Sequence, residues 1–282
     1  MPELPEVEVL ARHLGPLLND KTIERVEVLR PRVLRATSPA QFQRVLRGAR
    51  FVDLTRRGKY LLFTLRRSRE GRAISLLGHL GMTGRLYLQS ATAPLAKHAA
   101  VVFSLGKAVL VFEDTRCFGS LTLDTDRLQR LGPEPLGDDF NVDYFVCRLK
   151  RSAQPIKVRL LDQSLVAGVG NIYASEALFR AGVSPRLSAR RLTREQAQRL
   201  WRSVRVTLAD AIEFGSTVPL DWSGTGGRDG LFYYGQADRL SRNDRQKLLV
   251  YDQAGRPCSV CKTPIRRIVQ AARSTFYCPR CQ

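Results

Sequence analysis

The chain of 282 residues carries 46 lysine and arginine residues against 26 acidic residues, which gives a formal net charge of +20. A charge of this size indicates an anionic partner, either nucleic acid or an acidic membrane surface. The hydrophobic fraction of 44% excludes a disordered chain, and apolar runs such as residues 60–65 are too short to cross a bilayer. We therefore expect a folded protein that binds nucleic acid and has no membrane partner.

The first predicted element is an amphipathic helix over residues 3–18, because apolar residues recur there at steps of three and four. The predicted apolar face consists of Leu4, Val7, Leu10, Leu14 and Leu17. Proline is favoured at the first position of a helix, and glutamate complements the positive end of the helix dipole. On these grounds alone Pro2 and Glu3 simply begin the helix. Removal of Met1, which is common ahead of a small residue, would instead leave Pro2 as a free secondary amine.

Residues 22–125 consist of short alternating or β-branched runs separated by Gly, Pro and Ser clusters. This pattern predicts a β-sandwich or barrel. Residues 131–141 are rich in Pro, Gly and Asp and predict a linker between domains.

Helical periodicity returns after the linker, in residues 142–150, 155–181 and 188–215. Residues 216–250 are Gly-rich and charged without a clear period, and we expect them to form a loop. The predicted organisation is a β domain, a linker, a helical domain and a small cysteine module. Their boundaries are 1–130, 131–141, 142–250 and 251–282.

The amino terminus lacks the charge and hydropathy order of a signal peptide, so we expect a cytoplasmic protein with reduced cysteines. Four of the six cysteines form two CxxC pairs separated by sixteen residues, a spacing typical of structural zinc sites. These are Cys258, Cys261, Cys278 and Cys281. Because four protein thiolates complete a tetrahedron, the expected cofactor is one structural zinc ion with no open catalytic position. Cys117 and Cys147 are single and are interpreted as incidental or buried.

Short motifs distributed over nearly the whole chain carry a resemblance to a known family. They are PELPEVE, GKYLL, HLGMTG, DTRCFG, LGPEPL, VAGVGNIYASEALFRAGVSP and STFYCPRC, in that order. Together they resemble the formamidopyrimidine-DNA glycosylases, bifunctional enzymes that excise oxidised purines and nick the strand. The resemblance implies an α+β multidomain fold: an N-terminal β-sandwich with flanking helices, a helix–two-turn–helix domain and a four-cysteine zinc finger. It also implies a monomer that binds damaged duplex DNA without an organic cofactor and associates with the nucleoid.

The resemblance also assigns catalytic roles. Pro2 matches the nucleophile that attacks the sugar's anomeric carbon, and Glu3 matches the acid/base that assists base departure and ring opening. Glu6, one helical turn further on, either orients Glu3 or the amine, or is a surface glutamate. Lys59 matches the lysine that assists β-elimination, and Arg273 matches the zinc-finger arginine implicated in δ-elimination.

The family's DNA-binding residues match side chains in several further motifs. Met82, Arg116 and Phe118 match the three residues that fill the gap left by an everted base. His79, His98 and Asn171 match phosphate contacts. Lys150, Arg151 and Lys157 are expected to add basic contacts.

The chain departs from the family pattern at Cys117, where a second basic residue is usual, and at Ala99–Ala100, where Asp-His is expected. A third departure is the segment of residues 216–250, whose sequence does not match the family pattern. It lies at the position of the loop that, in the family, closes over the everted base.

The leading interpretation is excision of oxidised purines (8-oxoguanine and formamidopyrimidines) followed by β,δ-elimination. The nearest alternative is the same mechanism on oxidised pyrimidines, and PELPE at the start of the chain together with Met82, Arg116 and Phe118 argues against it. Two other classes remain as alternatives: a non-catalytic reader of damaged DNA and a basic zinc-ribbon protein that binds RNA.

Overall fold

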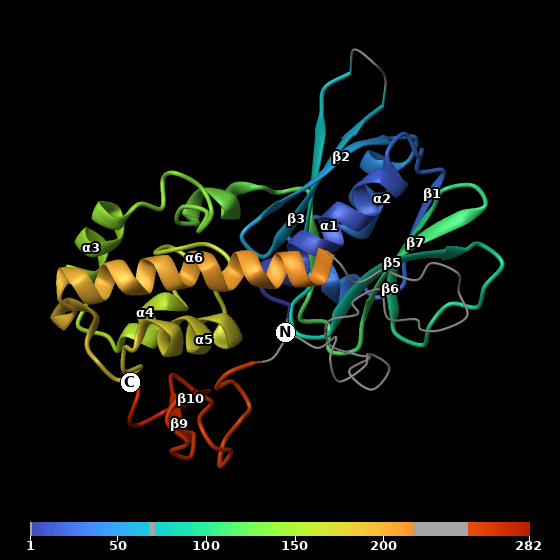
Figure 1. The fold of residues 1–282 in the computed structure, drawn as a ribbon. Coiled ribbons are helices and arrows are strands. Elements are labelled where there is room, and N and C mark those ends of the chain that lie inside the picture. Colours follow the sequence, from blue (N-terminus) through green and yellow to red (C-terminus); the bar gives the residue numbers. More distant parts are fainter. Residues whose placement is uncertain (1, 68–70, 217–247) are drawn as a thin grey trace. The chain divides into compact units, whose positions relative to one another are not determined.

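The computed structural model describes residues 2–67, 71–216 and 248–282 (Figure 1). Among these residues the chain forms two compact units, one of residues 2–129 and 215–216, and one of residues 130–214 and 248–282. The break lies next to the linker predicted at 131–141, and the finer domain boundaries stay a prediction. In the described part of the chain, no helix is both long and apolar enough to cross a membrane.

The first unit opens with α1 (Leu4–Leu18), which confirms the predicted amphipathic helix. Leu4, Val7, Leu10 and Leu14 are buried as expected. The last predicted position was wrong, because Leu18 is buried at 1% exposure whereas Leu17 is 37% exposed. Leu18, four residues after Leu14, lies on the buried face of the helix, whereas Leu17, three residues after Leu14, does not.

Eight strands follow in two antiparallel four-stranded sheets (Figure 1). The first sheet has the order β1 (Arg25–Val28), β6 (Ala99–Ser104), β7 (Ala108–Asp114), β5 (Gly84–Ser90). The second has the order β2 (Arg50–Arg57), β3 (Tyr60–Arg66), β4 (Ile74–His79), β8 (Ser120–Thr122). One apolar core is built from both sheets and α1, with Phe51 and Phe63 from one sheet and Phe103 and Phe112 from the other. The predicted β-sandwich is confirmed.

The sequence pattern missed helix α2 (Pro39–Leu46) inside the predicted β region. Ser38 caps this helix by accepting a hydrogen bond from the Gln41 amide at 3.2 Å, and Pro39 occupies the first turn. Phe42 and Leu46 are fully buried in the core of the first unit. The helix is short and has only two buried apolar residues, so its periodicity is too weak to stand out in the sequence. Short 3-10 turns lie at Pro31–Val33 and Asp126–Arg130.

The second unit is helical and ends in a β-hairpin (Figure 1). Its elements are α3 (Val142–Lys150), α4 (Ile156–Leu160), α5 (Asn171–Ala181), a 3-10 turn (Ala189–Arg191), α6 (Arg194–Ser216), β9 (Arg266–Gln270) and β10 (Arg273–Tyr277). The helix predicted at 142–150 is confirmed, whereas the stretch predicted at 155–181 forms two helices joined by residues 161–170. The loop predicted at 216–250 lies almost entirely outside the described residues.

Candidate functional site

Two buried carboxylates surround the start of α1. Pro2 is buried, and Glu3 and Glu6 are only 1% and 2% exposed. The Glu3 backbone N–H donates to Glu6 Oε2 at 2.7 Å, which is one half of a capping box at the helix start. The positive end of the helix dipole favours both carboxylates at this position. Glu6 is therefore not a surface residue; it holds the backbone of Glu3 in place.

Lys59 lies in the tight turn between β2 and β3, directly after Gly58. The strands pair at Arg57 and Tyr60, so Gly58 and Lys59 form the two-residue loop, and Gly58 has a positive φ of 58°. A glycine in the first central position is what such a hairpin turn requires. Arg56 Nη1 donates to the Gly58 carbonyl at 3.1 Å, and Arg56 Nε donates to Glu8 Oε2 on α1 at 2.6 Å. These contacts connect the hairpin that carries Lys59 to helix α1, which directly follows Pro2 and Glu3.

His79, at the end of β4, is held as a neutral imidazole. Its Nδ1 accepts a hydrogen bond from the Gly81 N–H at 3.1 Å, so the neutral ring carries its proton on Nε2 and can donate it to an acceptor such as phosphate. Burial, together with the positive charges of Lys59 and Arg127, lowers the pKa of His79 to about 4. The ring of Tyr60 packs against it, with the ring centroids 4.8 Å apart.

This pKa predicts an acid-sensitive contribution of His79 to stability. The unfolded chain takes up the proton near the ordinary pKa of 6.5 and the folded chain only near 4. Between these values the unfolded state binds more protons, so the free energy of unfolding falls as pH falls, by about 3 kcal/mol in total for this residue. We expect His79→Gln to flatten urea-unfolding stability between pH 6.5 and 4 relative to the parent. An imidazole of His79 that titrates near pH 6.5 in the folded protein would contradict this.

The three residues predicted to fill the gap behind an everted base lie in two loops of the first unit. Met82 is 46% exposed and Phe118 is 53% exposed. The Arg116 guanidinium lies 4.5 Å from the centroid of the Phe118 ring. The loops are in close contact, since a Cβ on Gly81 would lie 2.4 Å from the Gly119 amide nitrogen. Arg116 and Phe118 therefore contact each other at the surface, and Met82 is exposed on the adjacent loop, so none of the three belongs to the core.

Asp114, which no sequence motif indicated, holds both of these loops. Its carboxylate is fully buried and accepts hydrogen bonds from the Gly119 N–H at 2.6 Å, the Arg116 N–H at 3.1 Å and the Thr83 hydroxyl at 2.6 Å. The position of an acidic residue at the end of an apolar strand was the sequence signal that could have identified Asp114. Cys117, in the same loop, has a φ of +52° and packs partly against the core.

His98 precedes β6 and contacts an arginine that the sequence analysis did not single out. Its Nδ1 accepts from Arg30 Nη2 at 2.7 Å. A guanidinium can only donate, so the neutral ring keeps its proton on Nε2. Ala99 and Ala100 are buried in the sheet at 4% and 0% exposure, so the departure from the family pattern adds small side chains to the interior.

In the second unit, Asn171 lies at the first position of α5, close to the zinc-module hairpin. Its Nδ2 donates to the Ser274 carbonyl at 3.0 Å, next to the exposed Arg273. Lys157 Nζ donates to the same carbonyl at 2.9 Å and to Thr275 Oγ1 at 2.8 Å. The structure thus brings Asn171 and Arg273 into one region of this unit.

Two lysines that were predicted to contact DNA use their ammonium groups in hydrogen bonds within the protein. The prediction of a DNA contact for Lys157 was wrong, because its side chain is 1% exposed and its ammonium group holds the hairpin backbone. Lys150 Nζ donates to the Leu192 carbonyl at 2.8 Å and to the Arg190 carbonyl at 3.2 Å, so it caps a turn. Arg151, the next residue, is exposed. DNA contacts by Lys150 and Arg151 stay a prediction.

The four predicted cysteines form a cluster that fits a zinc ion. All four Sγ atoms lie within 4.8 Å of one another, with Cys258 and Cys281 at 3.9 Å and Cys261 and Cys278 at 3.4 Å. Tetrahedral coordination with Zn–S bonds of about 2.3 Å requires S···S separations of about 3.8 Å. The donor set is therefore that of a structural zinc site.

Glu176, which the sequence analysis missed, anchors the segment that leads into this cluster. It is 3% exposed on α5 and accepts from the backbone N–H groups of Leu249, Val250 and Tyr251 at 2.8–3.0 Å. An acidic residue in the middle of an apolar helix was the signal that could have identified it.

Loss of the metal is expected to unfold the zinc module. Cys261→Ser should lose zinc and protection of β9 and β10 from hydrogen exchange, since the module has little core of its own. Cys147→Ser, at an exposed position on α3, is the matched control and should retain one zinc per chain. We expect DNA affinity to fall at least about 10-fold in the first variant only, through loss of phosphate contacts. Normal affinity in zinc-free protein would show that the module does not bind DNA.

The chain matches known proteins over its whole length. The family model described as the formamidopyrimidine-DNA glycosylase N-terminal domain matches residues 1–121, the H2TH domain of the same enzymes matches residues 131–220, and a zinc finger found in FPG and IleRS matches residues 255–282. The formamidopyrimidine-DNA glycosylase of Carboxydothermus hydrogenoformans is 40% identical, with both chains fully covered. That of Thermus thermophilus is 42% identical over 100% of this chain and 98% of the relative.

Solved structures agree with these sequence matches. A Lactococcus lactis FPG mutant bound to DNA that contains Fapy-dG has a TM-score of 0.85 and 33% identity, covering 100% of this chain and 99% of that one. The wild-type Lactococcus lactis protein bound to DNA with an oxidised pyrimidine has a TM-score of 0.84 and 32% identity, with the same coverage. The FPG protein from Thermus thermophilus has a TM-score of 0.81 and 41% identity, covering 100% and 98%.

Proposed function

The chain belongs to the formamidopyrimidine-DNA glycosylase family, and on that premise we propose that it excises oxidised purines from duplex DNA and cleaves the resulting abasic site through Pro2. The observation that supports this most directly is the start of α1. Pro2 and Glu3 are buried there above a second carboxylate, on the helix that Glu8 and Arg56 connect to the turn carrying Lys59.

The chemistry explains why the nucleophile is a proline. After removal of Met1, the neutral amine of Pro2 attacks the anomeric carbon while the bond to the damaged base breaks and the base leaves with a proton. The bond between the anomeric carbon and the ring oxygen then breaks, the ring oxygen takes up a proton, and the secondary amine becomes an iminium, which stays cationic because no N–H remains to be lost. That cation withdraws electrons from the adjacent sugar carbon, so a proton is lost there and the 3′ phosphate departs with the electron pair. Since α-amino groups ordinarily titrate near roughly 7.7–8.0, a neutral fraction is present at physiological pH.

Glu3, Lys59 and Arg273 have complementary roles in this proposal. Glu3 delivers and accepts protons during base departure and ring opening. Lys59 assists β-elimination and attracts the adjacent phosphate. Arg273, at the start of β10 in the second unit, supports the second elimination, in which the 5′ phosphate leaves.

The DNA interface in this proposal uses exposed and donor groups of both units. Met82, Arg116 and Phe118 replace the everted nucleotide, and Arg116 contacts the orphaned opposite base. His79, His98 and Asn171 donate hydrogen bonds to phosphates. The four cysteines hold one structural zinc ion. We also propose that the protein acts as a monomer in the cytoplasm, where it associates with the nucleoid through DNA.

Trapping with borohydride tests the proposal. A duplex with a single 8-oxoguanine opposite cytosine should give a covalent adduct that peptide mass mapping assigns to Pro2. A similar enzyme binds a duplex with an oxidised pyrimidine, so the second candidate is the same mechanism on that lesion. Trapping on the pyrimidine or abasic duplex alone would retain the mechanism and change the specificity. Tight binding without an adduct on any duplex would favour a non-catalytic reader of damaged DNA.

A further inference from the structure

The loop between α4 and α5 is irregular and largely buried. Residues 165–170 are all buried, and they lead directly into Asn171 at the start of α5. Buried backbone outside helices and strands must find hydrogen-bond partners, because water does not reach it. In this loop much of that bonding comes from one side chain, Gln163.

The carboxamide of Gln163 closes the end of the loop onto its beginning. Its Nε2 donates to the Leu161 carbonyl at 3.0 Å and to the Val169 carbonyl at 2.9 Å, and its Oε1 accepts from the Gly168 N–H at 2.9 Å. A carboxamide offers two N–H donors and a carbonyl acceptor, and this one uses all three groups. Gln163 therefore binds both the N–H of Gly168 and the C=O of Val169.

The segment that Gln163 holds has little conformational restraint of its own. Gly168 has a φ of +86°, and Gly170 is the N-cap of α5 and has no side chain with which to cap it. Glycines lose the most backbone freedom when they are ordered, so a Gly-x-Gly turn without a clamp would sample many conformations. A ligand that needed one of them would bind more weakly, by the cost of ordering the turn.

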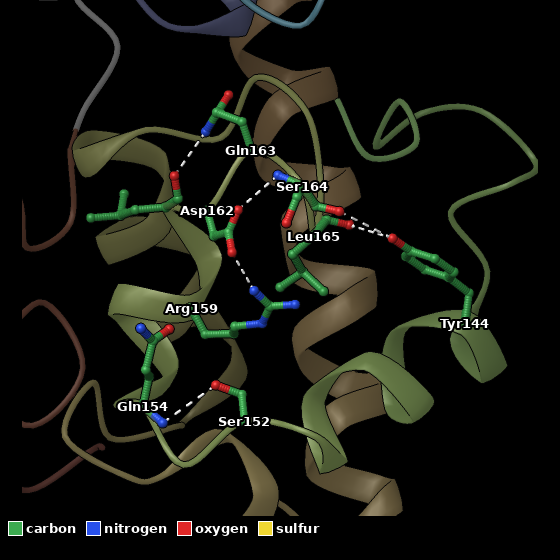
Figure 2. Close-up of polar contacts among 9 residues, drawn as sticks. Tyr144, Ser152, Gln154, Arg159, Asp162, Gln163, Ser164 and Leu165 are labelled. Atoms are coloured by element: carbon green, nitrogen blue, oxygen red, sulfur yellow. Dashed lines mark hydrogen bonds and ion pairs between the residues drawn. The ribbon is translucent and has the colours of Figure 1, made fainter. Parts of the chain in front are cut away.

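Two other side chains fix only the first half of this loop (Figure 2). The Tyr144 hydroxyl donates to the Leu165 carbonyl at 3.1 Å, and Asp162 Oδ1 accepts from the Ser164 N–H at 2.8 Å. In Figure 2, Tyr144 reaches the loop from one side, and the hydrogen bond drawn from Gln163 lies on the side away from Tyr144. In this described part of the chain, neither Tyr144 nor Asp162 forms a hydrogen bond with Gly168 or Val169, so these side chains provide a control for general loosening of the loop.

We propose that Gln163 is a positioning residue for DNA binding: it fixes the Gly168–Gly170 turn so that the first backbone N–H groups of α5 and the Asn171 amide face one phosphate. This inference rests on the proposed function. The first N–H groups of a helix have no partner within the helix and lie at the positive end of its dipole, so their direction decides whether a phosphate can be bound. Gln163 touches no DNA itself in this account.

The test compares Gln163→Met with Tyr144→Phe. Methionine has a similar shape but removes both donors and the acceptor, while the control removes a hydroxyl that donates to the Ser164 and Leu165 carbonyls in the first half of the same loop. Binding to a duplex with an uncleavable abasic analogue is measured over a series of salt concentrations. We expect Gln163→Met to weaken binding about 10-fold and to lower the slope of log K against log salt by about one, the loss of one phosphate contact. Tyr144→Phe should keep the parental affinity and slope.

A folded Gln163→Met protein with parental affinity and slope would overturn the inference, as would equal losses in both variants. If Gln163→Met does not fold, Gln163→Asn replaces it, because a shorter carboxamide cannot reach both Leu161 and Val169. Parental protein that neither binds nor traps on damaged DNA would instead refute the proposed function, so the two failures are distinguishable.

Discussion

Pro2→Gly is expected to bind damaged duplex with parental affinity but to lose about 100-fold or more in borohydride trapping, a loss within the range of covalent catalysis by an activated nucleophile. Glycine leaves a primary amine, whose imine can lose its N–H proton and become neutral. The electron sink that drives strand cleavage is then largely lost. The measurement is the single-turnover rate of adduct formation on an abasic duplex.

Pro5→Ala is the matched control for this variant. Pro5 lies in the first turn of α1 and is buried, so its replacement removes a proline from the same helix start without touching the amine. It should lower thermal stability modestly and leave trapping close to parental. Full trapping activity in Pro2→Gly, with the adduct still at residue 2, would show that the secondary amine is not required. An adduct mapped to Lys59 would identify Lys59, and not Pro2, as the nucleophile.

Glu3→Gln is expected to slow excision of 8-oxoguanine by about 1000-fold, the middle of the range for removal of a general acid or base. Gln retains an acceptor at the helix N-cap, so the capping box of α1 should survive. Cleavage of a pre-formed abasic site should be affected much less, because base departure has already occurred. Parallel single-turnover assays on the two duplexes separate these steps.

Glu6→Gln is the control that separates the role of Glu3 from that of the neighbouring carboxylate. Glu6 is as deeply buried as Glu3, and Gln at this position can still accept the Glu3 N–H. We expect at most about a 10-fold loss in excision, since the neutral side chain gives a weaker hydrogen bond than the carboxylate. Equal losses of excision rate in Glu3→Gln and Glu6→Gln would mean that the two carboxylates act together, through their charge or by maintaining the local structure. That result would contradict a specific acid/base role for Glu3.

The polar side chains that hold loops were the part of the site that the sequence could not predict. Asp114, Glu176 and Gln163 each hold a loop by accepting or donating backbone hydrogen bonds. In the sequence they are ordinary polar residues, and Lys157 looked like one more surface cation. Their roles depend on which backbone groups the fold leaves without partners, and those groups come from loops that the chain brings together only on folding.

Local patterns determined a different set of features. The apolar period of residues 3–18 predicted α1, since a helix needs one buried face. The CxxC spacing predicted the cysteine cluster, because each pair places two thiolates within reach of one ion. The order of short motifs identified the family, and the alternating runs predicted a β-sandwich or barrel. All of these depend on spacing along the chain, which the sequence states directly.

Only the tertiary structure decided which charges are available and how the site's groups are protonated. Glu6 proved to be buried beneath Glu3, Lys157 to be internal, and His79 to be a neutral donor with a pKa of about 4. Burial and the distances between charges set these properties, and both arise from strands and helices far apart in the sequence. Spacing along the chain therefore predicted the fold class and the metal site, whereas the protonation and direction of each polar side chain required the packed structure.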